Sequence, residues 1–343
     1  MHRPSAETAT IDWSPNLSGP ARSTSSSARQ VRIGVACIFG GVVALTLQDA
    51  VIKWLSSDFA LHEVTFARSL VAIVITLAIV RLEGGMRLLR TRRPGLHIVR
   101  CLLFIWTNMC FFMGVASMPL AEATAVFFVA PLFITVFSVV LLKDRVGPRR
   151  WAAVLVGMVG MVIMLRPGRE TLELAALFPV GAAVGYALLQ IVTRRLGTTD
   201  RASSMALYVH LAFAVASLGV GLVIGDGRFA GSDHPSLQFL LRAWSWPDGM
   251  ELALLFACGV LIGAGTYFLS QAYRVAQPAV VAPFEYTALP LSLLWGLLVW
   301  GDWPDATAAI GMALIAGSGL YVFYRETLTA PPAVVRRLLR RGR

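Results

Sequence analysis

The sequence has few charged residues. Only 14% of its 343 residues are Asp, Glu, Lys or Arg, and 57% are hydrophobic, whereas a soluble domain carries about 25% charged residues. The mean hydropathy is +0.69. Because a membrane-spanning helix needs roughly 20 apolar residues, this composition indicates a membrane protein and leaves little chain for a soluble catalytic domain.

Motifs of enzymes are also missing. The G-x-x-x-x-G-K-[ST] string of ATP-binding loops does not occur, and His62-Glu63 opens a zinc-protease string whose second His would have to replace Phe66. A serine nucleophile elbow around Ser318 would need Gly at Ala316. Four cysteines without CxxC spacing suggest neither a zinc site nor a disulfide framework: Cys37, Cys101, Cys110 and Cys258. We therefore expect no enzyme, no cofactor and no metal.

What the sequence does have is a succession of long apolar runs with short polar breaks. Residues 1–32 contain no apolar segment of the kind found in signal peptides, and their Ser-rich composition predicts a disordered cytoplasmic tail. Ten spanning helices are predicted, at 33–55, 61–82, 96–118, 120–142, 151–165, 174–194, 202–224, 250–273, 278–300 and 305–324.

Positive charges separate to one side of these ten runs. If the N-terminus is cytoplasmic, 24 of the 30 Lys and Arg residues fall in cytoplasmic segments, as the positive-inside rule requires. An odd number of spans would place these basic segments on both sides of the membrane. We therefore predict an all-α polytopic protein of the cell inner membrane, with both termini in the cytoplasm.

The excess of positive charge has an ordinary explanation in a membrane protein. The net charge of +11, and the Arg-rich tail at 327–343, could point to nucleic acid in a soluble chain. Arginine clusters next to spanning helices instead bind anionic lipid at the cytoplasmic face. We expect a lipid bilayer as partner and no nucleic acid.

The two halves of the chain resemble each other. A shift of 142 residues aligns Gln48 with Gln190 and Arg68 with His210. A shift of 159 aligns the Pro-Leu pair at 131–132 with that at 290–291, each followed by an acid at a similar distance. Because five helices form an odd-numbered unit, the second copy would be inverted in the membrane, and a substrate site would lie between the halves near the midplane.

Several strings resemble the EamA family of the drug/metabolite transporter superfamily. They are MPLAEATAVFFVAPLF at 118–133, LLKDRVGPRRW at 141–151, GMVGMVIMLRPG at 157–168, LQDAVIKWLS at 47–56 and EVTFARSLVA at 63–72. The second half departs from the family pattern, because WGDWPDATAAIG at 300–311 has Trp-Pro after its acid where a basic turn is expected.

The resemblance implies a fold and a class of activity. It implies ten helices in two inverted five-helix EamA repeats, at 33–168 and 173–326, and secondary transport of a small metabolite. Family members transport amino acids, S-adenosylmethionine, riboflavin or nucleotide sugars, so the resemblance does not fix the substrate. The direction of transport, proton coupling and a homodimer stay open.

Polar residues inside the apolar runs are the candidates for substrate contact or coupling. An ionisable side chain in hydrocarbon costs at least about 2.5 kcal/mol, so those present usually face a wet cavity or a partner. Glu285 lies between Pro283 and Pro290, where the helix should bend, and Arg68 could be its partner or an anion anchor. Either could equally be a structural residue that packs between helices.

Other polar residues form a second group of candidates. Asp49 and Lys53 are spaced to pair on one helix, although Asp49 could also touch substrate. Amides and rings inside a bundle suit a flat polar solute but also bridge helices. They are Gln48, Asn108, Gln190, His210 and Gln271, with Trp106, Tyr186, Tyr208, Tyr267, Tyr273 and Tyr286. Trp295, Trp300 and Trp303 are assigned to the outer aromatic belt.

These features predict a secondary active or facilitative transporter that alternates access around a site between the two repeats. Glu285 and Arg68 would be the charged elements of the pathway. The alternative is a non-transporting membrane scaffold or a scramblase-like lipid handler, which the sequence does not exclude.

Overall fold

The structure is a computed structural model that describes residues 24–89, 91, 93–143, 147–165, 173–196, 202–275 and 282–329. Within these ranges the regular elements are α-helices and short 3₁₀ helices, with no strand. The predicted all-α class is confirmed. The end segments 1–23 and 330–343, which hold most of both predicted tails, lie outside the described residues.

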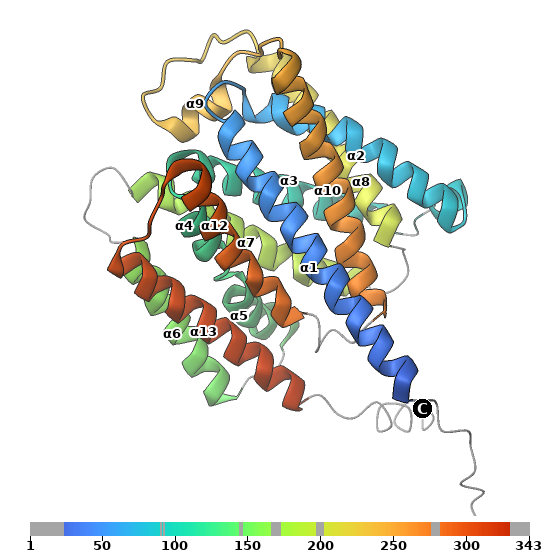
Figure 1. The fold of residues 1–343 in the computed structure, drawn as a ribbon, viewed down its shortest axis with the longest axis vertical. Helices are drawn as coiled ribbons and strands as arrows, with labels where there is room; N and C mark the ends of the chain where they lie inside the picture. Colours follow the sequence, from blue (N-terminus) through green and yellow to red (C-terminus); the bar gives the residue numbers. More distant parts are fainter. Residues whose placement is uncertain are drawn as a thin grey trace, which may run out of the picture.

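The helices follow the apolar runs of the sequence. Their bounds are α1 Thr24–Leu55, α2 Leu61–Glu83, η1 Met86–Leu89, α3 Pro94–Ser117, α4 Leu120–Phe127, α5 Ala130–Leu142, α6 Pro148–Leu165, α7 Glu173–Leu196, α8 Ala202–Ile224, α9 Pro235–Leu241, α10 Gly249–Val275, η2 Ala282–Thr287, α12 Ala288–Trp300 and α13 Ala306–Thr329. Figure 1 shows them as a bundle of long helices crossed by shorter ones.

Seven segments of the described chain are long and apolar enough to cross a membrane. Three shorter apolar helices, Trp151–Met164, Phe284–Trp300 and Ala306–Tyr321, fall at the fifth, ninth and tenth predicted runs. The polytopic membrane class is therefore confirmed, while the number of ten spans stays a prediction.

The structure corrects the sequence prediction at three places. Residues 24–32, assigned to the disordered tail, already form the first turns of α1. The run at 120–142 is two helices, because the chain turns at Phe128–Val129 before α5 begins. The run at 278–300 is likewise divided into the 3₁₀ turn η2 and helix α12. Pro131, near the start of α5, explains one break, since proline has no N–H to continue a helix but fits its first turn.

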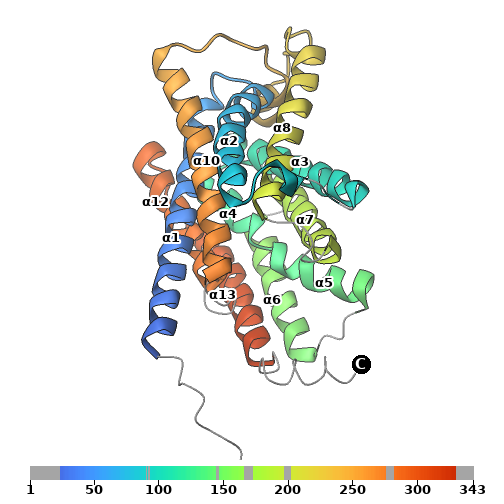
Figure 2. The ribbon, with the colours of Figure 1, turned by 90° about the vertical axis from the view of Figure 1, so that its right-hand side faces the viewer.

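Five pairs of helices make the main contacts of the bundle. The pairs are α1 with α10, α3 with α7, α6 with α13, α2 with α8, and α2 with α10. Figures 1 and 2 both show α1 beside α10 and α6 beside α13. Each pair joins an element from the first half of the chain to one from the second, so the two halves interlock.

Glycine allows one of these close approaches. A Cβ atom on Gly160 of α6 would lie 3.1 Å from the carbonyl oxygen of Gly311 in α13, and a Cβ on Gly311 would lie 2.9 Å from the carbonyl oxygen of Gly160. Small residues at facing positions let two backbones meet in an apolar solvent. The α6–α13 contact therefore depends on glycine on both sides.

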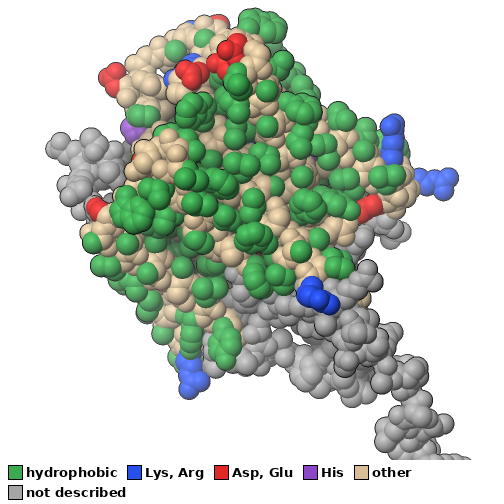
Figure 3. Space-filling view, viewed as in Figure 1, with side chains coloured by type: hydrophobic (Ala, Val, Ile, Leu, Met, Phe, Trp, Pro, Cys, Tyr) green, Lys and Arg blue, Asp and Glu red, His purple; other side chains and the backbone are tan. Residues whose placement is uncertain are grey.

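The outer surface is apolar. Figure 3 shows hydrophobic side chains over most of one face, with the described charged side chains mostly near its rim. Val74, Val215 and Leu222 are 68%, 71% and 77% exposed. A soluble protein rarely exposes so continuous an apolar surface, so lipid is the solvent that suits it.

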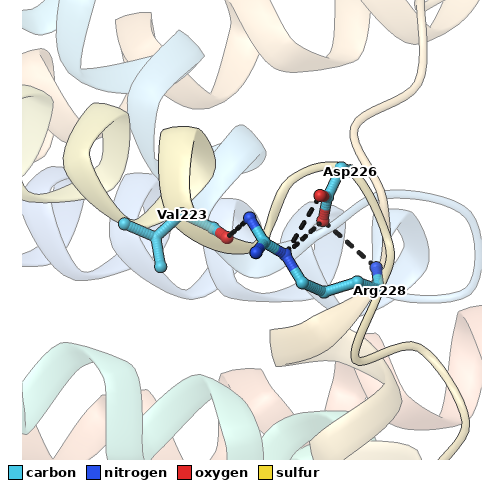
Figure 4. Close-up of polar contacts among 3 residues, drawn as sticks. All are labelled: Val223, Asp226 and Arg228. Carbon is cyan, nitrogen blue, oxygen red and sulfur yellow. Dashed lines mark hydrogen bonds and ion pairs between the residues drawn. The ribbon is translucent and has the colours of Figure 1, made fainter.

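The long connection between α8 and α10 carries helix α9 and a local ion pair. Arg228 Nε lies 3.0 Å from Asp226 Oδ2, and Arg228 Nη2 donates to the carbonyl oxygen of Val223 at 2.8 Å, near the end of α8 (Figure 4). The backbone N–H of Arg228 also donates to Asp226 Oδ1, and this bond and the guanidinium lower the pKa of Asp226 below its usual value. The contact fixes the turn that follows α8.

Candidate functional site

A cavity of about 240 Å³ lies inside the bundle, between helices of both halves of the chain. Its walls come from α1, α3, the α4–α5 junction, α7, α10 and the η2–α12 junction. The residues that line it are Val42, Leu45, Thr46, Gln48, Asp49, Phe104, Thr107, Asn108, Phe111, Phe112, Thr124, Phe127, Phe128, Tyr186, Ile262, Leu269, Glu285 and Ala288.

Two helices present regular faces to this cavity. On α1, Val42, Leu45, Thr46 and Asp49 line the wall at spacings of three, four and seven residues. On α3, residues 104, 107, 108 and 111 repeat this spacing. Residues so spaced lie on one side of an α-helix. Each helix therefore places an acid or amide among hydroxyls and apolar side chains on its inner face.

Both helix breaks also lie at the cavity. Phe127 and Phe128 line it where α4 ends, and Glu285 and Ala288 line it where η2 gives way to α12. Interrupted helices leave backbone groups without helical partners, and in membrane proteins they occur where such groups face protein or a wet cavity. The predicted bend around Glu285 thus places this carboxylate on the cavity wall.

Two carboxylates line the cavity, Asp49 and Glu285. Gln48 Nε2 donates a hydrogen bond of 3.1 Å to Asp49 Oδ1. Gln48 is only 2% exposed, and its Oε1 has no hydrogen-bond partner among the described residues. None of the lining residues is Lys, Arg or His. The wall is therefore rich in hydrogen-bond acceptors.

Arg68 lies behind this wall. It is 2% exposed, and its Nη2 donates to Asn108 Oδ1 at 2.5 Å. The guanidinium also lies over the rings of Phe112 and Phe213, at 5.2 and 5.6 Å from their centroids. Arg68 therefore holds Asn108 in position from behind the wall.

Aromatic rings form the opposite part of the lining. The ring of Phe127 lies 5.3 Å from that of Phe111 and 5.4 Å from that of Tyr186, both edge-to-face. Gln190, one turn further along α7, donates from Nε2 to the hydroxyl oxygen of Tyr186 at 2.6 Å. Gln190 thus reaches the cavity through Tyr186.

The structure brings some predicted site residues together and places others elsewhere. Gln48, Asp49, Asn108 and Glu285 line the cavity. His210 is buried on α8. The other six candidates are not among the lining residues: Arg68, Gln190 and His210, and three more, Tyr267, Gln271 and Tyr286.

The positions of these three residues follow from their helix faces. Tyr267 on α10 is 38% exposed, and Gln271 follows one turn later on the same helix. Tyr286 turns away from the cavity, with its ring 4.9 Å from that of Phe128 and its hydroxyl against Gly319 of α13. Sequence spacing alone did not reveal which face of each helix points inward.

Sequence reasoning missed the hydroxyl and phenylalanine lining. Thr46, Thr107 and Thr124 line the cavity, as do five phenylalanines. The helical spacing from Asp49 and Asn108 could have identified several of them. Trp295 was also misassigned to the outer belt, because its Nε1 donates inward to Thr46 Oγ1 at 3.1 Å.

Lys53 makes a separate contact at one end of the bundle. Its Nζ donates to the carbonyl oxygen of Met118 at 2.7 Å and lies 3.6 Å from Asp302 Oδ2 and 5.1 Å from the centroid of Trp300. The predicted pairing of Lys53 with Asp49 on α1 is therefore wrong. Lys53 instead ties the end of α1 to the α3–α4 junction and to the segment between α12 and α13.

The described residues contain no group of three or more His, Cys, Asp or Glu side chains arranged to hold a metal ion. The four cysteines are free thiols. What the cavity offers is acceptor oxygens and aromatic faces, a set suited to binding an organic solute.

A helical membrane protein with an acceptor-lined cavity between its halves is the architecture of a solute transporter. Residues 32–166 match the EamA-like transporter family. The family resemblance is thereby confirmed, and with it the expectation that the protein is a transporter and not an enzyme.

Relatives with curated names match most of the chain. The riboflavin transporter of Vibrio cholerae is 29% identical over 83% of this chain and 91% of its own length. The S-adenosylmethionine uptake transporter of Rickettsia felis is 28% identical over 85% of this chain and 93% of its own. A solved crystal structure of 21% identity superposes with a TM-score of 0.57, covering 88% of this chain and 99% of that one. It supports the fold.

Proposed function

We propose that this protein is a secondary active or facilitative transporter that moves a small, polar, ring-containing metabolite across the inner membrane. The cavity at the two helix breaks is the observation that carries this proposal. Interrupted helices at corresponding positions of two repeats are the strongest structural pointer to a transporter binding site. The names of the relatives favour S-adenosylmethionine or riboflavin as the kind of solute.

The helix contacts support two repeats of five helices, 33–168 and 173–326. If the first repeat ends with α6 and the second begins with α7, the pair α1–α10 has α7–α3 as its counterpart, and both pairs are in contact. The pairs α2–α8 and α6–α13 each exchange with themselves. This pattern is what a two-fold relation between the repeats produces.

The positions of the breaks support the same relation. Adding the 159-residue shift to Phe128, where α4 ends, gives Thr287, where η2 ends and α12 begins. An odd-numbered repeat places its second copy upside down, which gives ten spans with both termini in the cytoplasm. The two breaks would then meet near the middle of the membrane.

Alternating access requires contacts between the repeats that can open. The Lys53–Asp302 ion pair joins α1 of the first repeat to the α12–α13 segment of the second. With the N-terminus in the cytoplasm, it lies at the outer end of the bundle. We propose that it closes the outer end of the pathway in the state that the structure represents.

A cavity-blocking variant tests this function in proteoliposomes. Ala288 lines the cavity, whereas Ala253 on α10 is exposed on the outer surface. Ala288→Trp should abolish uptake of S-adenosylmethionine or riboflavin, and the matched control Ala253→Trp should retain it. Equal uptake by both variants would show that solute does not pass through the cavity.

The alternative functions predict different results in the same vesicles. A scaffold would give no saturable uptake of any solute, and a scramblase would move labelled lipid between leaflets. Saturable solute uptake, with no lipid movement above that of protein-free vesicles, would exclude both alternatives.

A further inference from the structure

The chemical character of the cavity indicates the class of solute that it selects. The described lining residues include two carboxylates and no basic side chain, and their three threonine hydroxyls donate inside the protein. Thr46 Oγ1 donates to the carbonyl oxygen of Val42, and Thr107 Oγ1 to that of Leu103. The donors left on the lining are the amide nitrogen of Asn108 and the hydroxyl of Tyr186, whereas Gln48 Oε1 and two carboxylates supply acceptors.

Gln48 gives an independent indication. Its Nε2 donates to a carboxylate oxygen of Asp49, which can only accept, so the orientation of the amide is fixed and Oε1 is the opposite atom. Gln48 lines the cavity, and it is 98% buried because only 2% of its surface is exposed. Its Oε1 has no hydrogen-bond partner among the described residues. A buried acceptor without a donor is costly. A solute that supplies an N–H group would satisfy it.

The aromatic side of the cavity complements these acceptors. Phe111, Phe127 and Tyr186 form a connected edge-to-face group. Aromatic faces attract cations and also stack on flat rings. The same cavity therefore offers oxygen acceptors for a charged donor and ring faces for either a cation or an aromatic system.

We infer that the transported solute carries a net positive charge and an aromatic ring, with Gln48, Asp49 and Glu285 receiving the charged end and the phenylalanine–tyrosine group the ring. This inference rests on the proposed transport function. Of the two solutes that the relatives' names provide, S-adenosylmethionine has a sulfonium, an ammonium, a carboxylate and an adenine ring and so carries a net positive charge, whereas riboflavin is uncharged.

Arg68 does not reverse this preference. Arg68 is not a lining residue of the cavity. Its guanidinium contacts two residues that are, Asn108 and Phe112. The two lining carboxylates, Asp49 and Glu285, lie on different elements, α1 and η2. A cation entering the cavity thus meets acceptors first.

A pair of ligands that differ in one charge gives a direct test. S-adenosylhomocysteine has the adenine and the amino acid group of S-adenosylmethionine but a neutral thioether in place of the sulfonium. Affinities of the purified full-length protein for both compounds and for riboflavin would be measured by calorimetry. We expect S-adenosylmethionine to bind at least about tenfold more tightly than either of the others.

Variants separate the charge from the ring. Asp49→Asn and Glu285→Gln should each reduce the preference for the sulfonium severalfold, while Asp226→Asn, the same kind of change on the exposed loop after α8, should leave it unchanged. Phe111→Leu should weaken both adenine compounds equally and keep their ratio. Thermal unfolding of each variant establishes that it is folded, and Glu285→Gln tests the inference if Asp49→Asn does not fold.

The outcomes distinguish this inference from the proposed function. Equal affinity for the two adenine compounds, tighter binding of riboflavin, or no binding of any of the three at millimolar concentration would overturn the cationic class. Saturable transport of riboflavin blocked by Ala288→Trp would overturn that class and still support the transporter function. Absence of any saturable uptake would overturn the transporter function itself.

Discussion

The hydrogen bond between Arg68 and Asn108 provides a quantitative test of the polar cluster behind the cavity. Arg68 Nη2 donates to Asn108 Oδ1 at 2.5 Å, from a side chain that is 2% exposed. Hydrogen bonds to charged groups contribute about 1.5–3 kcal/mol, whereas bonds between neutral groups on membrane helices average about 0.6 kcal/mol. The two classes are far enough apart to distinguish.

A double-mutant cycle with Arg68→Met and Asn108→Leu isolates this interaction. The free energy of unfolding would be measured by reversible denaturant titration in mixed micelles for the wild type, both single variants and the double variant. We expect a coupling energy above about 1.5 kcal/mol. The rings of Phe112 and Phe213 remain beside the guanidinium in Asn108→Leu, so they cancel in the cycle.

A neutral pair in the same bundle serves as the control. Thr124 Oγ1 donates to Ser292 Oγ at 3.2 Å, and both residues are buried. The cycle with Thr124→Val and Ser292→Ala should give about 0.6 kcal/mol. If the Arg68–Asn108 coupling energy is no larger than that of the control pair, then the Arg68 guanidinium does not hold Asn108 in position behind the cavity wall.

Three further changes test separate contacts. Gly311→Leu should lower the free energy of unfolding by about 1–3 kcal/mol, since its side chain would meet the backbone of α6; unchanged stability in the same titration would contradict that close approach. Lys53→Asp should reduce uptake by about tenfold by placing like charges together, and Lys53→Asp combined with Asp302→Lys should restore it. Failure of the exchange to restore uptake would remove the ion pair from the mechanism. Trp295→Phe should lower the free energy of unfolding by about 0.6 kcal/mol, because the hydrogen bond to Thr46 is lost. The difference between the fluorescence spectra of wild type and variant should be that of a buried indole. A difference spectrum typical of a solvent-exposed indole would return Trp295 to the outer belt.

The sequence by itself determined the class of fold and the family. Apolar runs bounded by short polar breaks predicted the helices closely, because a bilayer allows few alternatives to a spanning helix. The strings around 118–133 and 157–168 pointed to the family that residues 32–166 match. Glu285 was recognised because a carboxylate between two prolines is out of place in an apolar run.

Only the tertiary structure decided which polar residues share a cavity. Gln48, Asp49 and Asn108 lie on inward faces, while Tyr267 lies on an outward one, and all four were equivalent as polar groups in apolar runs. Lys53 forms its ion pair with Asp302, 249 residues away in the sequence, and not with Asp49, one turn away on its own helix. The physical reason is that in a membrane both faces of a helix are apolar, so hydrophobic periodicity, which marks the buried face of a soluble helix, gives no direction here.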